Sequence, residues 1–235
     1  MTTKSMRCVW LFAIAGFISN TGAFAVDRKI KVDDRLDVSA EALTEMMRAP
    51  DRGLPRDLID KARCVVVVPG MKKAGFIFGA EYGRGFAVCR RRAGSGWSAP
   101  AAVRVEGGSF GLQIGASETD IVLLVINDGG MKHLLSDKFT IGGDATAAAG
   151  PIGREVSAQT DAMMRAEMLS YSRSRGLFAG ISLEGATLRP DGKANRELYG
   201  RHATNREILS GDFKTPAVAA KLEGALNRDS ARRSR

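Results

Sequence analysis

The chain has 235 residues, of which 44% are hydrophobic, and a formal net charge of +9 at pH 7. This length is sufficient for one domain that buries its own core. Beyond the N-terminal residues no apolar run reaches the roughly 20 residues that cross a bilayer, so composition excludes a later transmembrane helix. The basic excess predicts an anionic partner, either a phospholipid surface or nucleic acid. A basic surface that only confers solubility would give the same charge.

The first 25 residues are typical of a secretory signal peptide. Lys4 and Arg7 precede an apolar run over residues 9–18, and residues 23–25 (Ala-Phe-Ala) form a small-x-small cleavage site. The alternative is a membrane anchor, for which the run is short. We therefore predict cleavage after Ala25 and export to the periplasm or envelope, where nucleic acid is not an expected partner.

Residues 36–47 are predicted to form an amphipathic helix, preceded by a linker over residues 26–35. Pro50 and Gly53 end this helix, and a short second helix is expected after Pro55. Helices of this kind usually cover a core, and the alternative is insertion into a membrane interface. The apolar side chains that would insert are those of Leu36, Leu43, Met46 and Met47.

Strands follow, and their glycines fall repeatedly on one face. Side chains alternate between the two sides of a strand, so residues 74–89 place four glycines on one side and bulky residues on the other. A similar plan recurs at residues 107–115 and 176–183. Glycine weakens a strand unless a bend, a bulge or a close backbone approach requires it. The glycines to which we assign such a structural role are Gly75, Gly79, Gly83, Gly85, Gly111, Gly115 and Gly180.

These patterns predict an α+β fold. Its centre would be a strongly curved, mainly antiparallel, glycine-rich sheet or partial barrel, flanked by N-terminal and C-terminal helices. Pro216 is well placed in the first turn of the last helix. Residues 36–227 would form a single domain, and residues 228–235 a basic, frayed tail.

Two cysteines remain after processing, Cys64 and Cys89, and each borders a strand-like run. An oxidising compartment would allow a disulfide between them, whereas the Cα separation that the bond requires cannot be read from the sequence. There is no C-x-x-C pair and no spacing typical of metal ligands, so neither a metal nor another cofactor is expected.

One catalytic pattern occurs. Residues 107–111 fit G-x-S-x-G, the nucleophile elbow of serine hydrolases, with Ser109 as the nucleophile. That elbow requires a strand followed by a helix, whereas these residues continue into an alternating, strand-like segment. Only His133 and His202 could serve as the base. We expect no enzyme, and a hydrolase that uses Ser109 is the alternative.

Basic residues surround the first glycine-rich segment and would gather at one end if residues 78–92 formed a hairpin. Such a cluster attracts anionic head groups, with about 1 kcal/mol per basic residue near the surface. A dispersed and solvated set of charges is the alternative. The candidate lipid-binding residues are Lys72, Lys73, Arg84, Arg90, Arg91 and Arg92.

Several ordered motifs resemble the signature of the SYLF lipid-binding domain family. They are KKAGF and GAEYGRG within residues 72–85, GWSAP at 96–100, GLQIG at 111–115, residues 120–126, and residues 170–185 from SYSR to EG. The match covers about residues 36–226, and the leader is similar to that of stand-alone exported bacterial members.

The resemblance implies a domain that binds acidic phospholipids, notably phosphoinositides in eukaryotic members. Some members also use the N-terminal amphipathic segment, here residues 36–47, at the membrane, and some fungal members bind actin. An exported protein is not expected to meet actin. The expected partner is therefore an anionic phospholipid membrane, and a scaffold that binds a protein partner is the remaining alternative.

Overall fold

The computed structural model describes residues 31–48, 53–75, 78–91, 96–110, 115–151, 165–174, 176–210 and 213–229. The predicted signal peptide, Arg92 and Gly111 lie outside these ranges. The helices are α1 (Val32–Arg48), α2 (Arg56–Lys61), α3 (Asp128–Leu134), α5 (Gly192–Tyr199), α6 (Asn205–Leu209) and α7 (Ala220–Asp229), with a 3-10 turn, η2 (Ala217–Ala219), before α7. The strands are β1 (Cys64–Gly75), β2 (Phe78–Cys89), β3 (Ala101–Phe110), β4 (Gly115–Val125), β5 (Phe139–Thr140), β6 (Ala147–Ala149), β7 (Met168–Ser174), β8 (Leu177–Gly180) and β9 (Thr187–Pro190).

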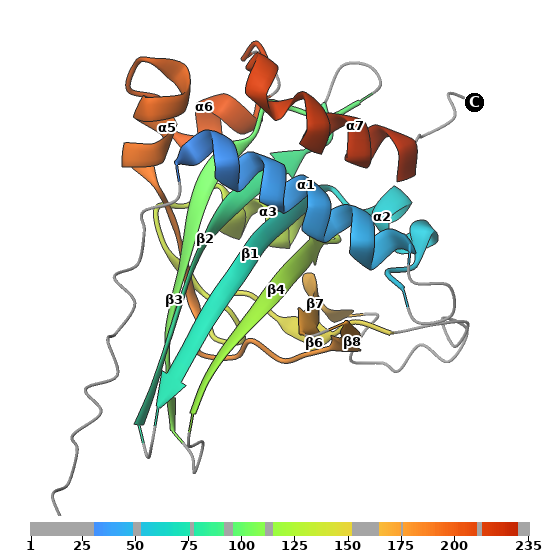
Figure 1. The fold of residues 1–235 in the computed structure, drawn as a ribbon, viewed down its shortest axis with the longest axis vertical. Helices are drawn as coiled ribbons and strands as arrows, with labels where there is room; N and C mark the ends of the chain where they lie inside the picture. Colours follow the sequence, from blue (N-terminus) through green and yellow to red (C-terminus); the bar gives the residue numbers. More distant parts are fainter. Residues whose placement is uncertain are drawn as a thin grey trace, which may run out of the picture.

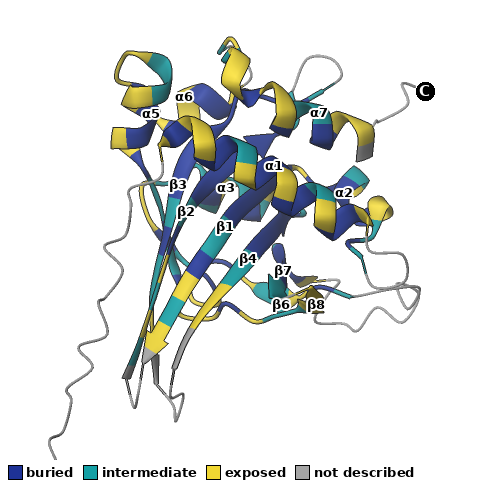
Figure 2. Cartoon of the chain, in the orientation of Figure 1, coloured by how far each residue is buried: buried dark blue, intermediate teal, exposed yellow. Residues whose placement is uncertain are grey.

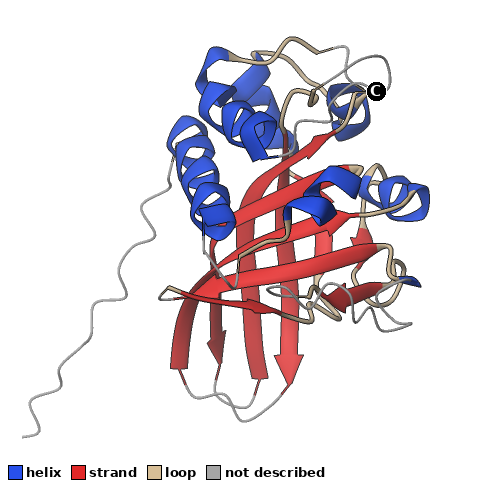
Figure 3. Cartoon of the chain, turned by 90° about the vertical axis from the view of Figure 1, so that its right-hand side faces the viewer, coloured by secondary structure: helices blue, strands red, loops and turns tan. Residues whose placement is uncertain are grey.

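All nine strands belong to one curled sheet in the order β5-β9-β3-β2-β1-β4-β7-β6, with β8 paired to β7. Among the pairings in the described part of the chain, β6 with β7 is parallel and the others are antiparallel. The sheet forms a half-barrel, and the helices gather around one end of it (Figures 1 and 3). The predicted α+β fold with a strongly curved, mainly antiparallel sheet is confirmed.

Two hydrophobic cores lie on opposite faces of the sheet. On the outer face α1 covers side chains such as Val65 and Val122, and α7 packs against α1. The inner face encloses Val66, Ile121 and the apolar side of α6. Alternate residues of one strand therefore enter different cores, which explains why residues 121–125 are apolar throughout. Away from the helices β1 to β4 continue as long strands whose exposure increases towards their far ends (Figure 2).

Helix α1 begins at Val32, four residues before the predicted start. Asp33 and Asp34 occupy its first turn, where carboxylates interact favourably with the helix dipole. Residues 32–35, which were predicted to belong to the linker, are therefore part of α1. The four side chains proposed for membrane insertion, those of Leu36, Leu43, Met46 and Met47, are buried in the outer core. That burial contradicts the insertion hypothesis in this structure, because the apolar face is already packed on the sheet. Similarly, Arg228 belongs to α7 and not to a frayed tail.

The glycines in the sheet permit close approach between backbones. A Cβ added at Gly85 would lie 2.8 Å from the carbonyl carbon of Val67 and closer still to its oxygen. Strand β1 shifts register between Val67 and Lys72, so Gly85 of β2 leaves space for this bulge. Gly180 likewise packs against the backbone of Gly150. Gly75 of β1 pairs with Gly79 of β2 on one side and with Gly115 of β4 on the other, near the far ends of these strands.

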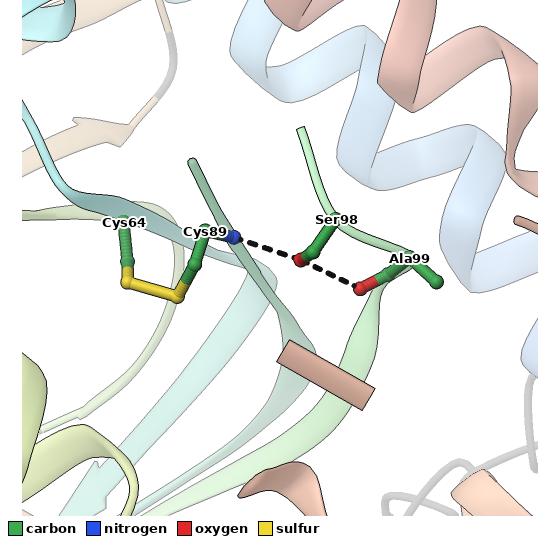
Figure 4. Close-up of a disulfide and its surroundings, with 4 residues drawn as sticks. All are labelled: Cys64, Cys89, Ser98 and Ala99. Atoms are coloured by element: carbon green, nitrogen blue, oxygen red, sulfur yellow. Dashed lines mark hydrogen bonds between the residues drawn. A yellow bond between two sulfur atoms is a disulfide. The ribbon is translucent and has the colours of Figure 1, made fainter. Parts of the chain in front are cut away.

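Cys64 and Cys89 form a disulfide on the inner face of the sheet (Figure 4). They are direct cross-strand partners at the ends of β1 and β2 that lie away from the connecting turn. Both are fully buried. The hydroxyl of Ser98 accepts a hydrogen bond from the backbone N–H of Cys89 at 3.0 Å and donates to the carbonyl of Ala99 at 3.0 Å, which fixes the following segment beside the bond.

Candidate functional site

A pocket of about 300 Å³ opens on the outer face of the sheet, beside the N-terminal half of α1. It lies where the helix-covered part of the strands gives way to their exposed ends. Residues from one helix and three adjacent strands line it: Arg35, Val38, Pro69, Gly70, Lys72, Tyr82, Gly83, Arg84, Glu118 and Asp120.

Strand periodicity explains why these side chains share a face. Tyr82 and Arg84 alternate with the inner-face residues of β2 and continue the row of Phe86, which belongs to the outer core. On β4, Glu118 and Asp120 continue the row of Val122 in the same way. Lys72 pairs with both Tyr82 and Glu118, so it points to the same side.

The bulge in β1 decides the direction of Lys72. Val67 faces the outer core, and strict alternation would then turn Lys72, five residues later, to the inner face. The register shift between Val68 and Met71 adds a residue to β1 relative to its neighbours and reverses this order. Without the bulge, Lys72 would face the inner side of the sheet and would not line the pocket.

Two arginines and one carboxylate form the basic side of the pocket. The Nε of Arg84 donates to Oδ2 of Asp191 at 2.7 Å, and Asp191 also caps α5 by accepting from the N–H of Ala194 at 3.2 Å. Arg35 is only 5% exposed. Burial lowers the pKa of Arg35, the nearby Arg84 guanidinium lowers it further, and the Asp191 carboxylate opposes both effects. Asp191 is thus the ion-pair partner of Arg84, and its charge also acts on the buried guanidinium of Arg35.

Carboxylates of β4 form the opposite side. Asp120 accepts from the N–H of Gly70 at 2.9 Å and from Nη2 of Arg173 at 2.7 Å. Arg173 also pairs with Glu45 of α1, which ties the helix to β4 and β7. The carboxylate of Glu118 lies above Gly70, because a Cβ added at Gly70 would be 2.5 Å from its Oε1. The pocket therefore has a cationic side and an anionic side.

The basic residues that were predicted to form one lipid-binding cluster lie in different places in the structure. Lys72 and Arg84 reach the pocket, whereas Lys73 lies on the inner face and pairs with Glu81 at 2.7 Å. Arg90 and Arg91 lie at the other end of β2. The predicted cluster at one end is wrong, because the hairpin joins β1 to β2 and does not fall within residues 78–92.

Arg90 and Arg91, which lie away from the pocket, are held by contacts with neighbouring groups. The guanidinium of Arg90 stacks over the ring of Trp97 at 4.0 Å and donates to the carbonyl of Ile59 at 3.3 Å. Arg91 donates to the carbonyl of Trp97 at 2.8 Å. These contacts give Arg90 and Arg91 a structural role at the helix-covered end of the sheet.

The sequence analysis missed Arg35 and Asp191. Arg35 was assigned to the linker, although the two aspartates before it are typical of a helix first turn. Asp191 follows Pro190, and an aspartate ahead of a helical segment is a recognisable N-cap. Its contact with Arg84 spans 107 positions of the sequence, and no local pattern contains that information.

The surroundings of Ser109 do not fit the serine hydrolase that was the alternative. Ser109 lies inside β3, opposite Gly79 of β2, and within the described residues the next element is strand β4 and not a helix. A nucleophile elbow requires a strand-to-helix turn. In the part of the chain that the structure describes, no cluster of three or more His, Cys, Asp or Glu side chains could hold a metal ion. None of the described helices is long and apolar enough to cross a membrane.

Comparison with known proteins places this chain in a family. The family model Ysc84, described as "Las17-binding protein actin regulator", matches residues 106–229, more than half of the chain. The chain is 38% identical over 177 residues to SH3 domain-containing protein PJ696.02 of Schizosaccharomyces pombe, covering 74% of this chain and 41% of that protein.

Two other relatives show similar identity. Human SH3 domain-containing YSC84-like protein 1 is 36% identical over 179 residues, which cover 76% of this chain and 52% of the relative. LAS seventeen-binding protein 3 of Saccharomyces cerevisiae is 36% identical over 175 residues, which cover 73% of this chain and 38% of the relative. The chain thus spans about half or less of the length of these relatives. The predicted resemblance is confirmed, and the chain belongs to the Ysc84 (SYLF) family.

Proposed function

We propose that this chain is a non-enzymatic protein that binds anionic phospholipid membranes and receives a phosphate head group in the outer-face pocket. The observation that carries the proposal is the pair of guanidinium groups, Arg35 and Arg84, beside the exposed Lys72. Arginine presents several N–H donors in a planar fork that matches phosphate oxygens, and lysine adds a point charge. The overall charge of +9 favours approach to an anionic surface.

The edge of the pocket supports a membrane as the source of the phosphate. Val38 of α1 and Tyr82 of β2 line the pocket and are 40% and 45% exposed. An apolar side chain and an amphipathic aromatic ring next to a phosphate site suit the boundary between head groups and acyl chains. A phosphate ester without an apolar group would bury no apolar surface against these two side chains.

The test compares two neighbouring lysines on opposite faces of β1. Lys72→Gln is expected to weaken binding to vesicles that contain phosphatidylglycerol about fivefold, which corresponds to about 1 kcal/mol per basic residue near the surface. Lys73→Gln makes the same change in net charge on the inner face and should have a clearly smaller effect. Co-sedimentation with vesicles over a salt series measures both, and affinity should fall as salt rises.

Lysine is preferred to arginine for this test. Removing Arg84 would leave the buried Asp191 carboxylate without its closest cation and would destabilise the fold itself. Equal effects of the two lysine variants would contradict a role of the pocket. An absence of any preference for anionic over neutral vesicles at low salt would contradict lipid binding as a whole.

A protein partner is the second candidate. The family description names Las17 binding and actin regulation, and one relative is named as a LAS seventeen-binding protein. Capture of a protein partner that does not depend on lipid, combined with no vesicle binding, would favour this function.

Localisation forms part of the same proposal. The leader supports export and action at an envelope membrane. Mass spectrometry of the N-terminus of protein recovered from its native host would detect cleavage after Ala25. An intact N-terminus would contradict export by this route.

A further inference from the structure

We infer that, given the phosphate site proposed above, the pocket selects phospholipids whose head group carries a primary ammonium next to the phosphate, as in phosphatidylethanolamine. The inference rests on the arrangement of charge within the pocket. Its two sides carry opposite charge, and a zwitterionic head group matches both.

The charges occupy different strands. Arg84 belongs to β2 and Glu118 to β4, and β1 runs between these strands. Neighbouring strands are about 4.8 Å apart, and Arg84 lies two residues along β2 from Tyr82, which is level with Glu118 across β1. The Cα positions of Arg84 and Glu118 are therefore separated by roughly 12 Å. That distance suits a ligand with a phosphate and an ammonium group two carbon atoms apart, with each group hydrogen-bonded to its own side.

The balance of charge argues against a head group with several phosphates. Three cations line the pocket, Arg35, Lys72 and Arg84, together with the carboxylates of Glu118 and Asp120, and the carboxylate of Asp191 stands behind Arg84. A second or third phosphate would lie against Glu118 and Asp120, where like charges repel. A single phosphate with an ammonium group avoids this repulsion.

Glu118 is the residue best placed to accept the ammonium group. Asp120 already accepts hydrogen bonds from Gly70 and Arg173, whereas Glu118 is exposed and its carboxylate extends over Gly70 at the floor of the pocket. A primary ammonium donates hydrogen bonds to a carboxylate, and a trimethylammonium group cannot donate them. Tyr82 offers an aromatic face beside the same site.

The experiment uses vesicles of equal surface charge. All contain the same fraction of phosphatidylglycerol, and the remaining lipid is either phosphatidylethanolamine or phosphatidylcholine. The wild-type chain is expected to bind the ethanolamine vesicles about tenfold more tightly, the size of one hydrogen bond to a charged group. Glu118→Gln should lose most of this preference while it still binds anionic vesicles.

Glu81→Gln is the matched control. Glu81 lies on the inner face of β2 and pairs with Lys73, so its substitution makes the same change in charge away from the pocket. This variant should keep the preference for ethanolamine vesicles. A preference that persists in Glu118→Gln would be an effect of bilayer packing and would overturn the inference.

The outcomes separate the inference from the function on which it rests. Wild-type binding that is strong but equal for both vesicle types overturns the head-group selectivity and leaves anionic-lipid binding intact. Binding to neither type overturns both. Competition by free O-phosphoethanolamine and phosphocholine gives a second measurement that needs no variant. Displacement of the chain from ethanolamine vesicles at the same concentration of either compound would also overturn the inference.

Discussion

Replacing Gly85 with alanine is expected to lower the free energy of unfolding by about 3 kcal/mol or more. The added Cβ would overlap the carbonyl group of Val67 and would approach the Cα of Val68 to 2.8 Å. Both neighbours are backbone atoms of a buried strand, so they cannot move aside as the end of a flexible side chain can. The strands would have to separate or the β1 bulge would have to be lost.

Two other glycines provide the comparison. A Cβ at Gly83 would meet side-chain atoms, Cγ1 of Val68 at 2.5 Å and Cγ of Met71 at 2.9 Å, and these can adjust in part. We expect a loss of about 1–2 kcal/mol for Gly83→Ala. At Gly108 the nearest atom, the carbonyl oxygen of Gly79, is at an ordinary 3.8 Å, so Gly108→Ala should change stability by less than about 0.5 kcal/mol.

Urea unfolding of the three variants measures this series. The expected order of destabilisation is Gly85→Ala, then Gly83→Ala, then Gly108→Ala, since it follows the nature of the atoms that each Cβ would meet. Equal effects at Gly85 and Gly108 would contradict close packing at the bulge and would favour a general preference for glycine in these strands.

The same bulge connects the glycines with the candidate site. Gly85 leaves space for it in β2, and its extra residue turns Lys72 towards the pocket. Gly85 thus contributes to the pocket indirectly, because the bulge that it accommodates determines which face of β1 carries Lys72. A binding defect in Gly85→Ala would therefore report a change in the strand and not a lost contact with lipid.

Much of the fold could be predicted because periodicity is local information. The alternation in residues 74–89 and the apolar run at residues 121–125 indicate strands, and a strand that is apolar on both faces must be covered on both. The amphipathic pattern of residues 36–47 likewise indicates a helix. It could not indicate what covers the helix, because a sheet and a membrane interface accept the same apolar face.

The candidate site was predicted only in part, for two physical reasons. The β1 bulge breaks the alternation between Val67 and Lys72, so counting along the sequence assigns later residues to the wrong face. In addition, the counter-charge of Arg84 is Asp191, which a long-range fold contact supplies. Lys72 and Lys73 are equivalent in the sequence, yet the sheet places Lys72 at the pocket and Lys73 on the opposite face, where it pairs with Glu81.

Removing the disulfide is the second change expected to have a large effect on stability. The bond joins Cys64 and Cys89, which are 25 positions apart, and it restricts the unfolded chain by closing that loop. Loop-closure entropy for this length corresponds to about 3–4 kcal/mol. The double variant Cys64→Ala/Cys89→Ala should therefore unfold at a clearly lower urea concentration.

The reduced wild-type chain is the control for the loss of two buried sulfur atoms. Both sulfur atoms lie in the inner core, so the alanine variant also loses some packing. Wild-type protein refolded under reducing conditions keeps those atoms and lacks only the bond. Its stability should fall between those of the oxidised protein and the double variant, and dithiothreitol should not alter the double variant.

Vesicle binding distinguishes a local role of the disulfide from one that reaches the pocket. The bond lies at the helix-covered end of β1 and β2, whereas the pocket begins at Pro69, beyond five strand residues that pair with β4. Those ladder hydrogen bonds hold the strand without the disulfide. At temperatures where the double variant remains folded, we therefore expect its affinity for anionic vesicles to match that of the wild type. A parallel loss of stability and affinity would instead show that the register of β1, and with it the direction of Lys72, depends on the bond.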